Sequence, residues 1–136
     1  MLANLARHCR QFVVLAFVGL AISVLPAVAE TVLEARVSKV LDGDTFTLSG
    51  HSRRIRVWGL DAPEWNHRGG SAATAAMRSL ISGKTLRCRV RDMDRYGRYV
   101  GQCFLPDGRD IAAEMIRQGV ATEYCRFSRG YYGTCR

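Results

Sequence analysis

The chain has 136 residues, of which 48% are hydrophobic and 24% are charged, and its formal net charge is +8. This composition excludes an intrinsically disordered chain, a collagen-like chain and a membrane protein with several spans. A positive excess of this size predicts a polyanionic partner, with nucleic acid as the first candidate and an anionic membrane surface as the second.

The first 29 residues are typical of a secretory signal peptide. Residues 1–11 carry two Arg and no acid, residues 12–25 are apolar without interruption, and Ala27-Val28-Ala29 provides a cleavage site. We therefore expect a mature domain over residues 30–136 that keeps a net charge of +6, because only those two Arg are lost. It is expected to be exported to the periplasm or beyond. An uncleaved membrane anchor is the alternative, because the apolar stretch almost reaches bilayer-spanning length.

Apolar alternation, capping residues and glycine stops predict five strands and two helices in the mature domain. The predicted strands cover residues 32–41, 46–49, 53–58, 84–91 and 98–105. One helix is expected from Ser71, as its cap, to Ser82, with Gly83 as the stop, and a second between Asp110 and Gly119. This order favours an α+β fold that is mainly β, a five-stranded Greek-key barrel of the OB type.

Four cysteines remain after removal of the signal peptide, namely Cys88, Cys103, Cys125 and Cys135. An even number in an oxidising compartment suggests two disulfides, although four cysteines allow three pairings. If the last hairpin centres between Arg95 and Tyr96, Cys88 falls opposite Cys103, where a bridge is sterically possible. Cys125 would then pair with Cys135 and close the tail. Buried thiols or a zinc site are the alternatives, but zinc is disfavoured because no C-x-x-C or H-x-x-H pair occurs.

Three acidic residues lie where the predicted topology would bring them together. Asp44 begins the second strand, and Asp61 and Glu64 follow the third strand in the segment DAPE. If these strands pair through a hairpin near Gly50, both ends meet at one rim of the barrel. Three carboxylates there would repel one another without a cation, and such oxygen ligands suit Ca²⁺ better than Mg²⁺ or Mn²⁺. Each segment taken singly is more typical of an ordinary turn or loop, and only their combination favours a site.

Two arginines would complete a site for phosphodiester hydrolysis. That reaction needs a base to deprotonate the attacking water and positive charge to neutralise the phosphoryl oxygens. Arg56 projects from the third strand five residues before Asp61, and Arg98 follows the turn in DRYGR. An acid held one water away from the metal could act as the base. Alone, each arginine is typical of ordinary surface charge, but with the acids they predict chemistry on phosphate.

The segments VLDGDTFTL, IRVWGLDAPE, DRYGR and EMIRQGVATEY, in this order, resemble the staphylococcal nuclease (thermonuclease) family over roughly residues 35–125. The resemblance implies an OB-type barrel and Ca²⁺-dependent cleavage of DNA and RNA. It implies metal ligation by Asp44, Asp61 and the backbone carbonyl of Ala62. It also implies that Glu64 activates water and that Arg56 and Arg98 bind phosphate.

The same resemblance places Arg95 and Tyr96 where the terminal phosphate of the nucleotide is held, and Tyr124 where an aromatic residue stacks on a base. The loop WNHRGG after Glu64 is shorter than in the staphylococcal enzyme, which puts clamping by that loop in question. The chain also stops where that enzyme continues into a third helix. A Cys125–Cys135 bridge is expected to do the stabilising work of that helix.

Three rival interpretations remain open at this point. The first is an OB-type module that binds nucleic acid without cleaving it. The second is a metal-independent ribonuclease that uses His51 and His67 as base and acid. The third is a structural domain associated with the cell envelope, which leaves the acids and arginines unexplained. The preferred hypothesis is a monomeric nuclease that has no stable membrane association once the signal peptide is cleaved.

Overall fold

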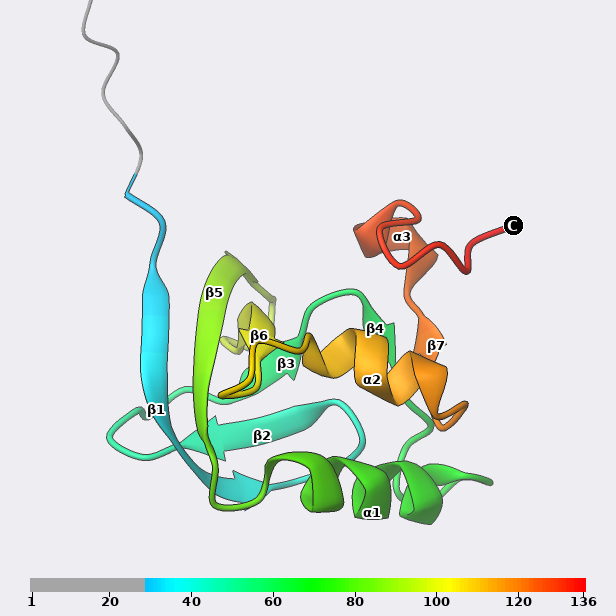
Figure 1. Ribbon diagram of the computed structural model, residues 1–136, viewed down its shortest axis with the longest axis horizontal. Coiled ribbons are helices and arrows are strands. Elements are labelled where there is room, and N and C mark those ends of the chain that lie inside the picture. The colour runs from blue at the N-terminus through cyan, green and yellow to red at the C-terminus, as the bar shows by residue number, and fades with distance from the viewer. Residues whose placement is uncertain (1–28) are drawn as a thin grey trace, which may run out of the picture.

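Five strands close into a barrel in the order β1-β2-β3-β6-β5 in the computed structural model, which describes residues 29–136 (Figure 1). They are β1 (Val32–Val40), β2 (Thr45–Leu48), β3 (Ile55–Val57), β5 (Thr85–Met93) and β6 (Tyr99–Phe104). Parallel pairing of β3 with β6 closes the barrel, and the other neighbours are antiparallel. The predicted OB-type α+β fold is therefore confirmed. The predicted signal peptide lies, apart from its last residue, outside the described residues.

The described chain also contains elements that the sequence pattern did not predict. A separate two-stranded sheet pairs β4 (Leu60–Asp61) with β7 (Thr122–Glu123), and a short helix, α3 (Cys125–Ser128), follows it. Elements of two to four residues are too short to show a hydrophobic period, so only tertiary pairing reveals them. The two longer helices, α1 (Gly70–Ile81) and α2 (Ile111–Arg117), match the two predicted ones within a residue or two. Among residues 29–136, no helix has the length and apolarity needed to cross a bilayer.

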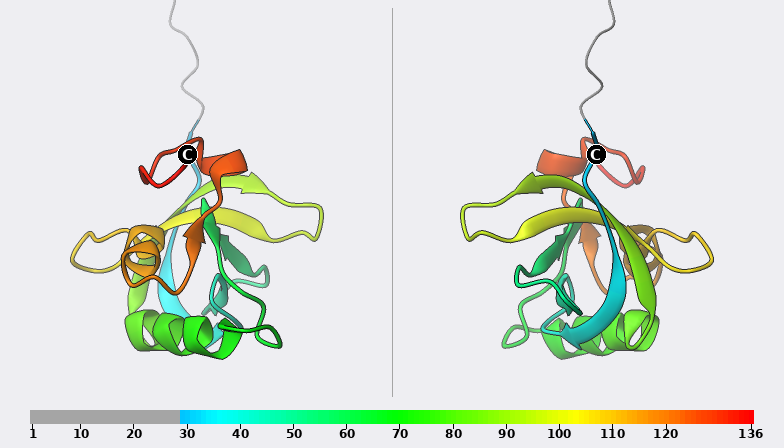
Figure 2. Two further views of the ribbon diagram at one scale, coloured as in Figure 1. Left: turned by 90° about the vertical axis from the view of Figure 1, so that its right-hand side faces the viewer. Right: turned by 90° about the vertical axis from the view of Figure 1, so that its left-hand side faces the viewer.

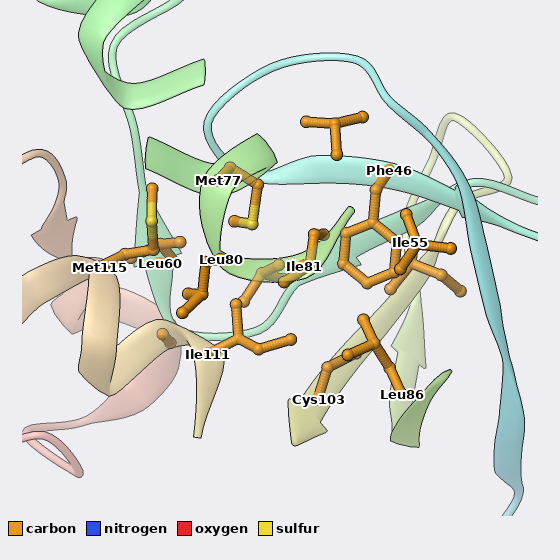
Figure 3. Close-up of a cluster of buried hydrophobic side chains, with 14 of the residues drawn as sticks. Phe46, Ile55, Leu60, Met77, Leu80, Ile81, Leu86, Cys103, Ile111 and Met115 are labelled. Atoms are coloured by element: carbon orange, nitrogen blue, oxygen red, sulfur yellow. The ribbon is translucent and has the colours of Figure 1, made fainter. Parts of the chain in front are cut away.

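The hydrophobic core lies between the barrel strands and the two longer helices (Figure 3). Phe46, Ile55 and Leu86 point inward from the strands and are fully buried. Met77 and Ile111 reach the same cluster from α1 and α2. Burial of each such side chain contributes roughly 1.5–3 kcal/mol, so the helices are held by their apolar faces against the barrel.

The start of α1 differs from the prediction that Ser71 caps it. The helix begins at Gly70, and its N-cap is Gly69, which has a φ of 86° and makes no side-chain cap hydrogen bond. A Cβ atom on Gly70 would lie 1.8 Å from the carbonyl oxygen of Glu64. This close approach of two backbone segments sets the start of α1, because no residue except glycine fits there. The cap predicted for α2 is confirmed, since Asp110 accepts from the amides of Ala112 and Ala113.

The β5–β6 hairpin places Cys88 directly opposite Cys103, and the two are disulfide-bonded. Cys125 is bonded to Cys135, so the pairing favoured by the strand register is the one present. A bulge between Val90 and Asp92 shifts the register beyond the cysteines by one residue. The bulge turns the end of the hairpin that carries the predicted phosphate-binding residues.

The antiparallel pairing of β2 with β3 is confirmed, with Thr45 opposite Arg56. The connecting loop turns at Gly50, whose φ is 78°. The amide of Val57 donates to the carbonyl of Asp44 at 2.8 Å, which continues the ladder beyond the end of β2. The beginning of β2 and the end of β3 therefore meet at one rim of the barrel.

Candidate active site

Asp44 is the buried centre of the acidic rim, with 8% of its surface exposed. Its Oδ1 accepts from the hydroxyl of Thr45 at 2.9 Å, and its Oδ2 accepts from the amide of Ala62 at 3.2 Å. The amide of Asp44 itself donates to the carboxylate of Asp42, which fixes the turn before β2. Burial raises the pKa of Asp44 to about 6, against the opposing effect of the Arg56 guanidinium and these hydrogen bonds.

Arg56 joins the two predicted metal-binding aspartates. Its Nη1 lies 2.8 Å from Oδ2 of Asp44, and its Nη2 lies 3.8 Å from Oδ1 of Asp61. Nη1 also donates to the carbonyl oxygen of Leu60 at 2.8 Å. The Arg56 side chain is only 15% exposed, whereas that of Asp61 is 59% exposed. The guanidinium is therefore held on its buried side, and the site opens to solvent on the Asp61 side.

Glu64 and Arg98 line one hollow of about 880 Å³, whereas Asp44, Arg56 and Asp61 are not among its lining residues. The lining residues come from the turn of the β5–β6 hairpin, from the β2–β3 loop and from the segment after β4. These three parts of the chain project from the same side of the barrel (Figure 2). The other lining residues are mostly basic or aromatic and comprise Ser52, Arg53, Arg54, Tyr96 and Gly97. A basic hollow with one carboxylate suits an anionic substrate and a general base that removes a proton from an attacking water.

Arg98 is oriented by Asp94 from the other side of the hairpin turn. Its Nε donates to Oδ2 of Asp94 at 2.7 Å, and its Nη1 reaches the hydroxyl of Thr45 at 3.5 Å. Burial works against the charge on Asp94, but hydrogen bonds from Arg98 and from two backbone amides hold its pKa below the ordinary value. Through Thr45, Arg98 is connected to Asp44 and hence to Arg56.

The predicted residues for the terminal phosphate sit on the same hairpin. Tyr96 is 67% exposed and lines the hollow. Arg95 donates to the Tyr96 hydroxyl at 2.7 Å, and the guanidinium of Arg98 lies 5.4 Å from the centre of the Tyr96 ring. The Tyr96 side chain thus contacts two guanidinium groups, and of these two arginines only Arg98 lines the hollow.

Tyr124, the predicted base-stacking residue, is not part of the lining of the hollow. It is 36% exposed, packs edge-on against Phe127 with ring centres 4.7 Å apart, and donates its amide to the carbonyl of Gly59. His51 and His67 are also absent from the lining, so the hollow does not bring a histidine pair together.

Three contributors to the site were missed in the sequence. Asp94 holds Arg98, Thr45 links Asp44 to Arg98, and Arg54 adds charge to the hollow. The spacing of Asp94 and Arg98 within DRYGR was a signal, because opposite charges four residues apart across a tight turn can meet. Nothing local in the sequence identifies Thr45, since its partner Arg98 lies 53 residues away.

The residues at the rim fit a hard divalent cation, although they do not form a ready three-carboxylate cluster. The carboxylates of Asp44 and Asp61 already converge on one positive group, Arg56, and all the side-chain donors are oxygens. Within the described residues, Glu64 does not complete a cluster with these two aspartates. Among residues 29–136, the only group of three possible metal ligands is Glu123, Cys125 and Cys135. The two sulfur atoms of this group are bonded to each other in a disulfide.

The barrel and its rim define a small OB-type protein in which two aspartates contact one buried arginine. A model of the staphylococcal nuclease homologue family matches residues 54–133, which is more than half of the chain. The chain therefore belongs to the family of staphylococcal nuclease homologues. Asp44 precedes the matched range, and the β2–β3 pairing brings it to the residues inside that range.

Sequence similarity to curated proteins supports the same family. The chain is 40% identical over 98 residues to an "Uncharacterized endonuclease" of Escherichia coli O157:H7, which covers 71% of this chain and 64% of that protein. An "Uncharacterized endonuclease" of Haemophilus influenzae is 30% identical over 109 residues, with 78% and 61% covered. The "Probable staphylococcal-like nuclease CAN1" of rice is 38% identical over 76 residues, with 56% and 23% covered. The chain thus spans less than two thirds of the length of these relatives.

Proposed function

We propose that this protein is a Ca²⁺-dependent nuclease that hydrolyses phosphodiester bonds of DNA, RNA or both. The observation that carries the proposal is that Arg56 contacts both Asp44 and Asp61, while Glu64 and Arg98 line one hollow, and Thr45 connects Arg98 to Asp44. The endonuclease and nuclease names of the relatives support the same class of activity.

Asp44, Asp61 and the carbonyl oxygen of Ala62 are the residues that would hold the cation. When bound, Ca²⁺ would supply positive charge for the phosphate oxygens and favour deprotonation of water. Asp44 is suited to this position because burial disfavours its negative charge unless a cation lies nearby. Asp61 is suited to it because its carboxylate faces solvent, where a cation can enter.

Glu64 would accept the proton of the attacking water. Its carboxylate lines the hollow but is not tied into the Asp44–Arg56 pair, so it remains free for proton transfer. A positioned general base of this kind contributes about 10²–10⁴-fold to a reaction rate. This separation from the two aspartates is the arrangement expected when a water lies between the base and the cation.

Arg56 and Arg98 would neutralise charge on the phosphate. Both guanidinium groups are fixed by carboxylates, Arg56 by Asp44 and Arg98 by Asp94, so little side-chain entropy would be lost on binding. The basic residues of the hollow, including Arg53 and Arg54, would attract the flanking phosphates of a polynucleotide.

We further propose that the protein is exported and works as a monomer without stable membrane association. The two disulfides support export, because such bonds persist in oxidising compartments. Mass spectrometry of the protein isolated from the cell envelope and medium tests this point. A mature N-terminus at Glu30 is expected, whereas an intact residue 1–29 segment in the membrane fraction would contradict export by cleavage.

A nuclease assay on the full chain, with Ca²⁺ and with a chelator, tests the central proposal. We expect cleavage with Ca²⁺ only, and a loss of about 10²-fold or more in kcat for Glu64→Gln with nucleic-acid binding retained. Glu114→Gln, which alters a carboxylate on α2, is the matched control and should keep wild-type turnover. Cleavage in the chelator, or equal turnover of Glu64→Gln and wild type, would contradict it. Binding without any cleavage would favour the non-catalytic OB-type module instead.

A further inference from the structure

Glu123 is a buried carboxylate outside the proposed chemistry, and it organises the C-terminal segment, residues 123–135. It is 7% exposed. Its Oε1 accepts from the hydroxyl of Ser128 and from the amide of Tyr132 at 3.0 Å. Its Oε2 accepts from the amide and hydroxyl of Thr134 at 2.9 and 2.8 Å. Four hydrogen bonds from one short stretch of chain make Glu123 the internal anchor of this segment.

Two further links hold the C-terminal segment in place. The Cys125–Cys135 disulfide closes it into a loop. The Tyr132 hydroxyl donates to both carboxylate oxygens of Asp110 at 3.2 and 3.0 Å, which ties the loop to the N-terminus of α2. The Glu123 hydrogen bonds and the disulfide hold the segment together internally, and the Tyr132 hydroxyl attaches it to α2, so the segment has little freedom to move.

The C-terminal segment packs on the turn between β3 and β4. Gly59 in that turn has a φ of 70°, and a Cβ atom there would lie 2.9 Å from the Tyr132 ring and 3.2 Å from Cβ of Ser128. The amide of Tyr124 donates to the carbonyl of Gly59 at 2.8 Å. The turn is therefore covered closely by the segment, and only glycine fits between them.

The C-terminal segment is connected to Arg56 through strand β4. Strand β7 ends at Glu123, the first residue of the segment, and it pairs with β4, so that Leu60 is opposite Glu123 and Asp61 is opposite Thr122 (Figure 1). The carbonyl of Leu60 is the one that accepts from Nη1 of Arg56. A displacement of β4 would thus move both this acceptor and Asp61 relative to the guanidinium.

We infer that the C-terminal segment positions Arg56 and Asp61 for catalysis, with Glu123 as its key residue. Glu123 is a positioning residue, since it acts through β7, β4 and the Leu60 carbonyl and does not touch the substrate. This inference rests on the proposed nuclease function for its catalytic consequence, but the structural link it describes exists independently of turnover. It also makes the site dependent on the Cys125–Cys135 bond, because reduction to two thiols by an external dithiol would release one end of the segment.

The first arm of the test measures amide hydrogen exchange in the full chain, which requires no activity. In Glu123→Gln, a peptide covering residues 57–62 should exchange at least about fivefold faster, while peptides of α1 keep the wild-type rate. Glu114→Gln is the matched control and should change neither. If Glu123→Gln fails to fold, Tyr132→Phe, which removes only the hydroxyl that bonds Asp110, is measured instead. An unchanged rate over residues 57–62 would overturn the inference.

The second arm separates positioning from general stability by a double-substitution cycle. Glu123→Gln should lower kcat about tenfold in the wild-type background with KM for nucleic acid unchanged. In the Arg56→Ala background the same change should lower kcat by a clearly smaller factor, since only Asp61 is then left to be positioned. Equal losses in both backgrounds would overturn the inference. If wild type shows no Ca²⁺-dependent turnover, the proposed function fails, and the exchange arm alone decides the structural link.

Discussion

The Oδ2 atom of Asp44 lies 2.8 Å from Nη1 of Arg56, and the pairing of β2 with β3 brings the two together. The two side chains are 11% and 15% exposed, so the pair is largely withdrawn from water. The Arg56 guanidinium neutralises the charge of Asp44 when no cation is bound. The same contact fixes the guanidinium in a position where it could bind phosphate. One contact therefore serves both the stability of the rim and the proposed chemistry.

Arg56→Ala should reduce both stability and turnover. It leaves the buried Asp44 carboxylate without its partner, so we expect a loss of about 2–4 kcal/mol in the free energy of unfolding at pH 7. The kcat should fall about 10³-fold, as for other arginines that stabilise a phosphoryl transition state. Urea unfolding and single-turnover kinetics measure the two effects. Arg87→Ala, on the exposed face of β5, is the control and should change neither property by much.

Asp94→Asn should impair turnover with little effect on stability. Asn cannot provide the charged acceptor that holds Nε of Arg98, so the guanidinium would sample other positions. We expect kcat to fall about tenfold and the free energy of unfolding to change by less than about 1 kcal/mol. Asp107→Asn removes a similar aspartate–arginine pair far from the hollow and should keep full turnover. Equal kcat values for the two variants would show that Asp94 does not orient Arg98.

Glu123 should make the protein acid-sensitive. Burial alone would raise its pKa, but hydrogen bonds from Ser128, Tyr132 and Thr134 lower it from 4.5 to about 2. A folded-state pKa below the unfolded value means that the stabilisation is complete above pH 4.5 and is lost as the pH falls to about 2. Wild type should thus exceed Glu123→Gln in stability at pH 7, and the difference should shrink between pH 4.5 and 2. Melting curves of both proteins across this pH range measure the difference in stability. A difference that stays constant from pH 7 to pH 2 would contradict the prediction.

Ca²⁺ should stabilise the folded protein if it binds at the rim. A ligand at 100 times its Kd adds about 2.7 kcal/mol to the free energy of unfolding. Asp61→Asn should abolish most of this gain, because it removes the solvent-facing carboxylate from the proposed set. Differential scanning calorimetry with Ca²⁺ and with chelator measures the gain. An increase of the same size in Asp61→Asn would place the cation elsewhere.

The double variant Cys125→Ser/Cys135→Ser should lower the melting temperature. The bond closes a loop with a sequence separation of 10 residues, for which the chain-entropy model gives about 3 kcal/mol. For a domain of this size that corresponds to a decrease of about 12–24 °C. Calorimetry of the wild-type and variant chains tests this value. An unchanged melting temperature would show that the bond does not do the stabilising work of the third helix of the staphylococcal enzyme.

Local patterns determined most of the architecture. Alternation of apolar residues was sufficient for the five barrel strands, because a strand that is half-buried must alternate. The Asp110 cap and the register of Cys88 with Cys103 could likewise be predicted, since each depends on residues close together in the chain.

The tertiary structure decided what depends on distant partners. The start of α1 is set by the Glu64 carbonyl against Gly70, not by the hydroxyl of Ser71. The β4–β7 pair joins segments about sixty residues apart and is too short to show a period. Thr45 and Glu123 gain their roles only from contacts that folding creates. Backbone propensity acts over a few residues, whereas packing and hydrogen bonding of buried groups act between whatever the fold brings together.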